Sequence, residues 1–204
     1  MISTQIIVLA KKPYRENALL LSGLSPDFGR LNLVANSAMK LSEKKFPIAD
    51  LFRELEVEFN EDNANDLFTA RQMELATAFD ALANNPKHFQ LAGRIGSFLL
   101  KNAVPAVPQP LTYDALRGVL SQLSAPEDTL GRWTMEQCAV VIRTTYLYES
   151  GLLPTPKSEK ESDFLENLVA AGVENSPLPI CKATYWRTLN NWLLALCEFH
   201  RLQK

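Results

Sequence analysis

The stretch KKPYRENALLLSGLSPDFGRLNLVA, residues 11–35, decides how the first third of the chain folds. It holds an apolar run at residues 17–24 and the start of a second at residues 30–36, separated by the break Ser-Pro-Asp-Phe-Gly. In this break Pro26 fixes its own φ, Asp27 can hydrogen-bond to its own backbone, and the closing glycine can adopt a positive φ. These residues are typical of a tight turn, so the stretch predicts two strands joined as a β-hairpin.

Three further segments have the composition or the alternation of strands. Residues 4–10, TQIIVLA, are rich in β-branched side chains, which suit a buried strand. Residues 51–59 alternate between apolar side chains and glutamates, while residues 66–76 could form a fifth strand or an early helix. Five short strands within about 75 residues predict a small closed or nearly closed β-barrel, because closure removes unpaired strand edges.

From about residue 77 the apolar residues recur with the period of a helix. This pattern covers five segments, residues 86–104, 112–124, 127–154, 163–173 and 183–203. We expect Thr112 to cap the second of these helices and Gly151 to end the third. The sequence therefore predicts an α+β protein, with a five-stranded barrel in residues 1–78 and an all-α helical domain in residues 79–204.

The composition is that of an ordinary globular protein, with 47% apolar residues and a net charge of −2. No apolar run is long enough to span a bilayer, and no secretory signal pattern is found, so we expect no contact with a membrane. The three cysteines, Cys138, Cys181 and Cys197, are odd in number and widely spaced. This usage fits a reducing cytoplasm rather than a disulfide framework.

The charges are unevenly distributed along the chain. Residues 1–46 have a net charge of +4, and residues 47–85 have a net charge of −7. Seven cations of the first segment could line one flank of the barrel, namely Lys11, Lys12, Arg15, Arg30, Lys40, Lys44 and Lys45. A groove lined by cations can follow a sugar–phosphate backbone without reading its sequence. The alternative is a solubilising surface, because the acidic segment that follows could repel the same ligand.

Aromatic residues near these cations could stack on bases. Phe28 at the predicted turn and Phe52 before the fourth strand are the candidates. Packing inside the protein is the stronger interpretation of each, since large aromatic side chains usually serve the core.

The sequence shows no pattern of catalytic or metal-ligating residues. His88 and His200 stand alone, no two cysteines have the short spacing of zinc ligands, and no nucleophile motif is found. Glu54, Glu56 and Glu58 could in principle form an acid/base or Mg²⁺ cluster, but their alternation with apolar residues favours a solvated strand face. We therefore predict that the protein is not an enzyme and holds no cofactor or metal. Among the possible functions, an enzyme ranks last.

The order of several motifs resembles a known family. Tyr-Arg-Glu at 14–16, Ser-x-x-x-Gly-Arg at 25–30 and Val-Ala at 34–35 resemble the opening of the bacterial DNA repair protein RecO. VVIRTTYLYESGLLP, residues 140–154, is similar to that family's long helix and the Gly-x-x-Pro corner after it. The resemblance implies an N-terminal OB-fold, a helical C-terminal domain and a role in recombinational repair. Many members hold zinc through four cysteines after the corner, but residues 155–164 contain none, so no zinc is inferred.

The resemblance also implies partners. RecO-like proteins bind single- and double-stranded DNA, anneal complementary strands, and act with RecR and the single-strand-binding protein to load a recombinase without nucleotide hydrolysis. On this hypothesis the seven cations of residues 1–46 contact the DNA backbone.

The alternative hypothesis is an adaptor that docks repair partners with little direct binding to DNA. The acidic tail of the single-strand-binding protein would need an apolar pocket rimmed by cations. The last helix offers Trp186, Arg187, Trp192 and Arg201 for such a pocket, although core packing is the stronger interpretation of these residues.

Overall fold

The computed structural model describes residues 1–14, 17–36, 48–60 and 67–203. Its contacts divide the chain into two compact units. One unit comprises Met1–Asp80 with Asn102–Pro110, and the other comprises Ala81–Lys101 with Leu111–Lys204. The sequence-based boundary between residues 78 and 79 stays a prediction.

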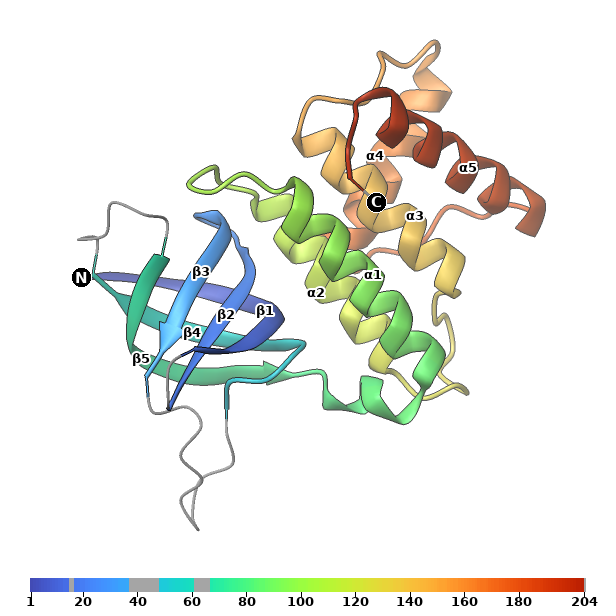
Figure 1. Cartoon of the computed structure of the whole chain (residues 1–204). Helices are drawn as coiled ribbons and strands as arrows, with labels where there is room; N and C mark the ends of the chain where they lie inside the picture. The colour runs from blue at the N-terminus through green and yellow to red at the C-terminus, as the bar shows by residue number, and fades with distance from the viewer. Residues whose placement is uncertain (15–16, 37–47, 61–66, 204) are drawn as a thin grey trace. The chain divides into compact units, whose positions relative to one another are not determined.

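The first unit contains a closed barrel of five strands (Figure 1). The strands are β1 (Ile2–Tyr14), β2 (Ala18–Ser25), β3 (Gly29–Ala35), β4 (Arg53–Phe59) and β5 (Leu67–Ala78). They follow one another around the barrel in the order β1-β2-β3-β5-β4, and β4 closes it by pairing with β1. Only the pair β3–β5 is parallel among these strands. The predicted five-stranded barrel is confirmed, and the ambiguous fifth segment is a strand.

The core of the barrel consists of the inward side chains of the strands. It includes Ile6, Val8, Leu21, Leu31, Leu33, Leu55, Val57 and Phe59. The glutamates between the apolar residues of β4 were all expected to face water, but Glu54 is only 3% exposed. The register of β4 with β5 shifts between Glu54 and Leu55, so both of these neighbours are buried. Such a bulge interrupts the alternation on which the expectation depended.

The break between β2 and β3 forms the predicted tight turn. Gly29 has φ +57, a conformation that glycine adopts without steric cost. The Thr4 hydroxyl donates to Asp27 Oδ2 at 2.6 Å and lies 2.9 Å from the Ser25 hydroxyl. These bonds hold the turn on the first strand.

Residues 102–110, which we call the strap, lie against this turn although they follow it by more than seventy positions in the sequence. The backbone N–H of Ala106 donates to the Phe28 carbonyl at 2.9 Å, and that of Gln109 donates to the Pro26 carbonyl at 2.9 Å. The strap therefore satisfies backbone acceptors of the barrel and belongs to the first unit.

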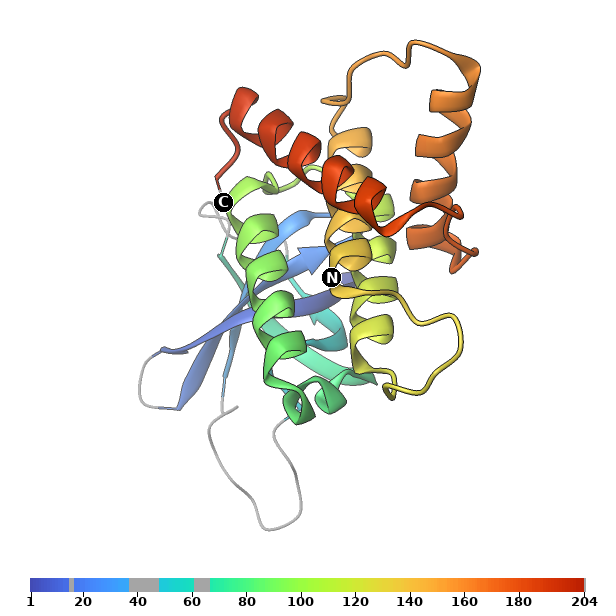
Figure 2. The same cartoon turned by 90° about the vertical axis from the view of Figure 1, so that its right-hand side faces the viewer.

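The second unit is helical (Figures 1 and 2). A 3₁₀ turn, η1 (Asp80–Asn84), leads into α1 (Pro86–Asn102), α2 (Pro110–Ser124), α3 (Met135–Glu149), α4 (Glu159–Glu174) and α5 (Ala183–Phe199). Helices α4 and α5 both pack against α3. The predicted combination of an N-terminal barrel and a helical C-terminal part is confirmed. In the described part of the chain, each helix is too short or too polar to cross a membrane.

The start of α3 differs from the prediction of a helix over residues 127–154. Thr134 caps it, because its hydroxyl accepts from the Gln137 N–H at 3.2 Å while Gln137 Oε1 accepts from the Thr134 N–H at 2.7 Å. This capping box sets the first turn of the helix at Met135. The end is as predicted, since Gly151 follows the last turn with φ +66.

The start of α2 also differs from the prediction. The helix begins at Pro110, whose missing N–H costs nothing in a first turn, so Thr112 lies inside the helix. The carboxylate of Glu149 accepts the N–H groups of Leu111 and Thr112, each at 2.8 Å, and the Thr112 hydroxyl at 2.5 Å. A side chain from the end of α3 therefore caps α2, which the local sequence could not indicate.

Candidate nucleic-acid interface

The outer surface of β1, β2 and β3 carries a group of polar and cationic side chains. Because the odd-numbered leucines of β2 and β3 point into the core, their even-numbered neighbours point outward. The register pairs Lys12 with Leu20 and Ser22 with Asn32, and Arg30 lies further along β3. We call these five residues the outer face. In an OB-fold, the corresponding face of strands 2 and 3 binds oligonucleotides.

The outer face combines charge with hydrogen-bonding groups. Lys12 is exposed, and Arg30 and Asn32 are half-buried. The Ser22 hydroxyl donates to Asn32 Oδ1 at 2.6 Å, which fixes the amide and leaves its nitrogen as a donor. Along β2, the partners of Lys12 and Arg30 are four residues apart, so the two cations are separated by roughly 13 Å along the strand. They lie on the same side of the strands, but the Nε group of Arg30 is buried, so contact of Arg30 with a phosphate has to come from its Nη groups.

Lys11, also predicted to contact DNA, already has a counter-ion. Its Nζ lies 2.5 Å from Asp50 Oδ1, and both side chains are partly exposed. Burial acts to raise the pKa of Asp50, but the hydrogen bonds from Lys11 and from the Leu51 N–H outweigh it and hold that pKa below its ordinary value. Asp50 therefore stays ionised and compensates the charge of Lys11 at neutral pH.

The other predicted contacts divide into two groups. Arg15, Lys40, Lys44 and Lys45 lie outside the described residues. Of the two aromatic candidates, Phe52 is only 2% exposed, and Phe28 packs edge-on against Phe59 with ring centroids 5.6 Å apart. Phe28 therefore packs on the barrel core and Phe52 is buried, so both rings serve packing, as the stronger interpretation of the sequence held.

Negative charge gathers on another part of the barrel, across β4 and β5. Glu56 pairs directly with Glu74, and both are exposed. Gln72 donates to Glu74 at 2.7 Å and is the cross-strand partner of Glu58. Like charges in direct opposition destabilise a strand pair and repel a polyanion. Charge alone therefore directs a nucleic acid away from this surface.

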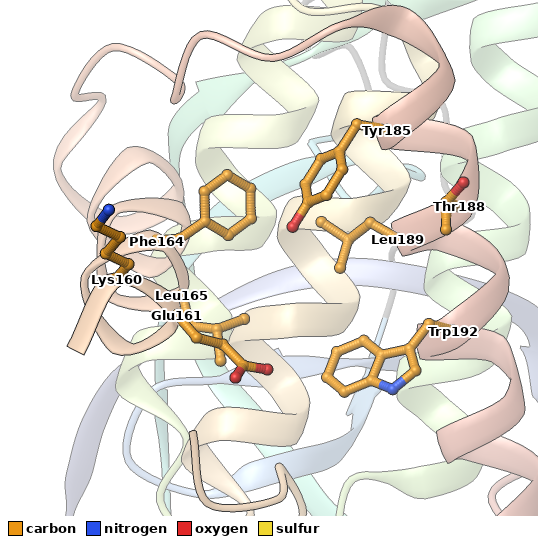
Figure 3. Close-up of a pocket in the computed structure, with 8 residues that line it drawn as sticks. All are labelled: Lys160, Glu161, Phe164, Leu165, Tyr185, Thr188, Leu189 and Trp192. Carbon is orange, nitrogen blue, oxygen red and sulfur yellow. The ribbon is translucent and has the colours of Figure 1, made fainter. Parts of the chain in front are cut away.

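The helical unit holds an apolar groove between α4 and α5, with a volume of about 550 Å³ (Figure 3). Its lining comes from both helices and consists of Lys160, Glu161, Phe164, Leu165, Tyr185, Thr188, Leu189 and Trp192. The rings of Phe164 and Tyr185 meet edge to face, with centroids 5.4 Å apart. Lys160 places a cation at the rim.

The residues predicted for a partner pocket do not all lie at this groove. Trp186 is 4% exposed and packs in the core, whereas Trp192 lines the groove. Arg187 and Arg201 are exposed, but neither lines the groove. Successive helical residues differ by about 100°, which places Arg187 roughly 150° from the mean direction of the groove residues on α5. The sequence did not indicate Lys160, because its place at the groove depends on the contact between α4 and α5.

The described residues contain no group of three or more His, Cys, Asp or Glu side chains placed to hold a metal ion. Within the described residues, Cys138, Cys181 and Cys197 form no disulfide bond. Burial raises the pKa of Cys138 to about 12, which keeps this thiol protonated at neutral pH.

Residues 1–79 match the family model described as recombination protein O N terminal. The matched segment comprises all five strands of the barrel and ends before α1. A comparison of the chain with curated proteins gives no match. The similarity therefore bears on the barrel, where the outer face lies.

Proposed function

Because the chain carries a RecO N-terminal domain, we propose that it binds single- and double-stranded DNA and helps complementary strands to anneal or a recombinase to load. The family consists of recombination mediators, and its domain indicates a protein of recombinational DNA repair. The match of residues 1–79 is the observation that carries the proposal, and the outer face supports it with a surface of suitable chemistry.

In this proposal phosphate contacts supply the affinity. Lys12 and Arg30 contact the backbone from the outer face, and Arg15, Lys40, Lys44 and Lys45, which lie outside the described residues, add further contacts. Each phosphate that a cation neutralises releases counter-ions, so binding weakens as salt rises and shows little preference for sequence. No nucleotide is hydrolysed, and neither a metal nor a cofactor is needed.

A fluorescence polarisation titration with labelled oligo-dT at two salt concentrations tests this function. We expect tighter binding at the lower concentration, with a slope of log K against log salt of about −0.7 for each phosphate contact. Replacing Lys12 and Arg30 together by glutamine should reduce this slope by about 1.4. Lys87→Gln, on the exposed side of α1, is the control. Absence of binding in dilute buffer, or binding that ignores salt, would refute the proposal.

The groove between α4 and α5 favours a second function, the docking of repair partners. The groove is apolar, and its lining carries one cation, Lys160, and one acid, Glu161. A peptide that combines apolar side chains with carboxylates, such as the tail of the single-strand-binding protein, would bury its apolar side chains there and pair a carboxylate with Lys160. A RecR-like mediator is the other partner that we propose.

Binding of a synthetic tail peptide tests the groove. Trp192→Ala and Lys160→Glu should each weaken binding about tenfold or more, since one removes apolar contact and the other reverses the rim charge. Arg187→Glu is the matched control, because Arg187 belongs to the same helix but points away from the groove. Equal binding by the variants and the native protein would exclude this site.

A further inference from the structure

A half-buried arginine on α3 lacks an acidic partner. The Nη1 group of Arg143 donates to Asn190 Oδ1 on α5 at 2.7 Å and to the Ala139 carbonyl at 3.4 Å. Within the described part of the chain, no carboxylate lies within 4 Å of its guanidinium. Burial is the main influence on Arg143 and lowers its pKa, so the surroundings disfavour the charge and a bound anion would compensate it.

The free side of this guanidinium is open to a ligand. Its Nε and Nη2 groups donate to none of the described residues, and neither nitrogen is fully buried. An arginine presents parallel N–H groups that fit two oxygens of a phosphate or carboxylate. Asn190 holds the opposite side, so the guanidinium is oriented before a ligand arrives.

A second cation, Arg187, lies on the same helix as Asn190. Arg187 precedes Asn190 by one turn of α5, and residues at this spacing are neighbours on a helix surface. Arg187 is exposed and forms no ion pair with the residues that the structure describes. Residues 181–204 carry four lysine or arginine residues and one acidic residue, so this end of the chain is basic while the whole protein is slightly acidic.

We infer that Arg143, Arg187 and Asn190 form a phosphate-binding site on the helical unit, where a segment of DNA backbone binds in addition to the strand on the barrel. This inference rests on the proposed function. Two arginines on neighbouring helices, in a basic part of the chain, fit the regularly repeated phosphates of a nucleic acid, which needs no apolar pocket beside them. A second DNA site would let one protein hold two strands, which annealing requires.

The test measures oligo-dT binding by the full chain and by the variant Arg143→Gln/Arg187→Gln. We expect affinity to fall about tenfold or more at low salt and the salt slope to shrink by about 1.4. Arg94→Gln removes the same charge from an exposed position of α1 and should change neither quantity. The rate of annealing of complementary oligonucleotides should fall with the double variant as well.

The single variant Arg187→Gln controls for the possibility that the double variant fails to fold. Arg143 forms a hydrogen bond to α5, so its loss could disturb the fold, whereas the Arg187 side chain is exposed. This single variant should fold and should reduce the slope by about 0.7. Native affinity and slope in both variants would overturn the inference, as would weaker binding of the acidic tail peptide with unchanged binding of DNA. If the native chain itself binds no DNA, the proposed function fails, which is a different result.

Discussion

At the scale of single residues, Lys11 and Asp50 form a pair whose two members should affect DNA binding in opposite directions. Asp50→Asn removes the charge that compensates Lys11, so affinity and the magnitude of the salt slope should rise, the slope by about 0.7. Lys11→Gln leaves the carboxylate near the DNA and should weaken binding.

The double variant Lys11→Gln/Asp50→Asn removes both charges of the pair and should bind nearly as the native chain does. Fluorescence polarisation with oligo-dT measures the three variants. If Asp50→Asn binds less tightly than the native protein, the carboxylate is part of the binding surface and the interpretation of this pair is wrong.

Gly29 is the second residue with a definite consequence. A Cβ atom there would lie 2.4 Å from the Val107 carbonyl oxygen and 2.5 Å from that of Val104, and its φ is positive. We expect Gly29→Ala to lower the free energy of unfolding by about 2 kcal/mol or more, since strain and a forced shift of the strap add together. Urea unfolding measures this loss.

The control for this substitution is Gly131→Ala. Gly131 also has a positive φ, +75, but nothing lies within 4 Å of a Cβ placed on it. Only the conformational cost remains, about 1 kcal/mol. Equal losses at the two glycines would show that the close approach of the strap contributes nothing.

At the scale of elements, α2 depends on a cap from another helix. Glu149→Ala should cost about 2–3 kcal/mol of unfolding free energy, because two backbone N–H groups and the buried Thr112 hydroxyl lose their acceptor. Circular dichroism during urea unfolding measures the change. Glu166→Ala, at an exposed position that accepts one bond from Ser162, should cost less than about 0.5 kcal/mol. A similar cost for both would argue against the cap.

The elements also show where reading of the sequence succeeds. The barrel strands follow from local alternation and from the turn chemistry around Pro26 and Gly29, which act within a few residues. The predicted start of α3 at residue 127 was wrong. Leu130 and Trp133 continue an apolar pattern before the helix, but the capping box at Thr134 decides where the helix begins. The cap at Glu149 joins two helices, and no local pattern indicates it.

The same distinction applies to the candidate site. The strand register puts Lys12 and Arg30 on the same side of neighbouring strands, and alternation within one strand cannot show such a relation between strands. The burial of Trp186 and the exposure of Arg187 follow from the helical period, whereas the place of Lys160 beside Trp192 depends on tertiary packing. The role of Arg143 depends on a partner 47 positions away in the sequence.

At the scale of the whole molecule, the weak net charge of −2 conceals surfaces of opposite sign. Glu56→Gln/Glu74→Gln removes the opposed acids of β4 and β5, and we expect it to strengthen oligo-dT binding several-fold in dilute buffer. Because the effect acts over a distance, it should vanish near 0.5 M salt, where screening is nearly complete. An effect that persists at high salt would mean that these glutamates contact the DNA directly.

The strap has a consequence for how the protein can be dissected. The chain leaves the first unit after Asp80, returns at Asn102 and leaves again after Pro110, so three covalent crossings join the units. A fragment that stops at residue 79, where the family match ends, would omit the donors that satisfy the Pro26 and Phe28 carbonyls. A fragment that is to contain the intact barrel must therefore include the strap as well, although the strap lies between α1 and α2 in the sequence.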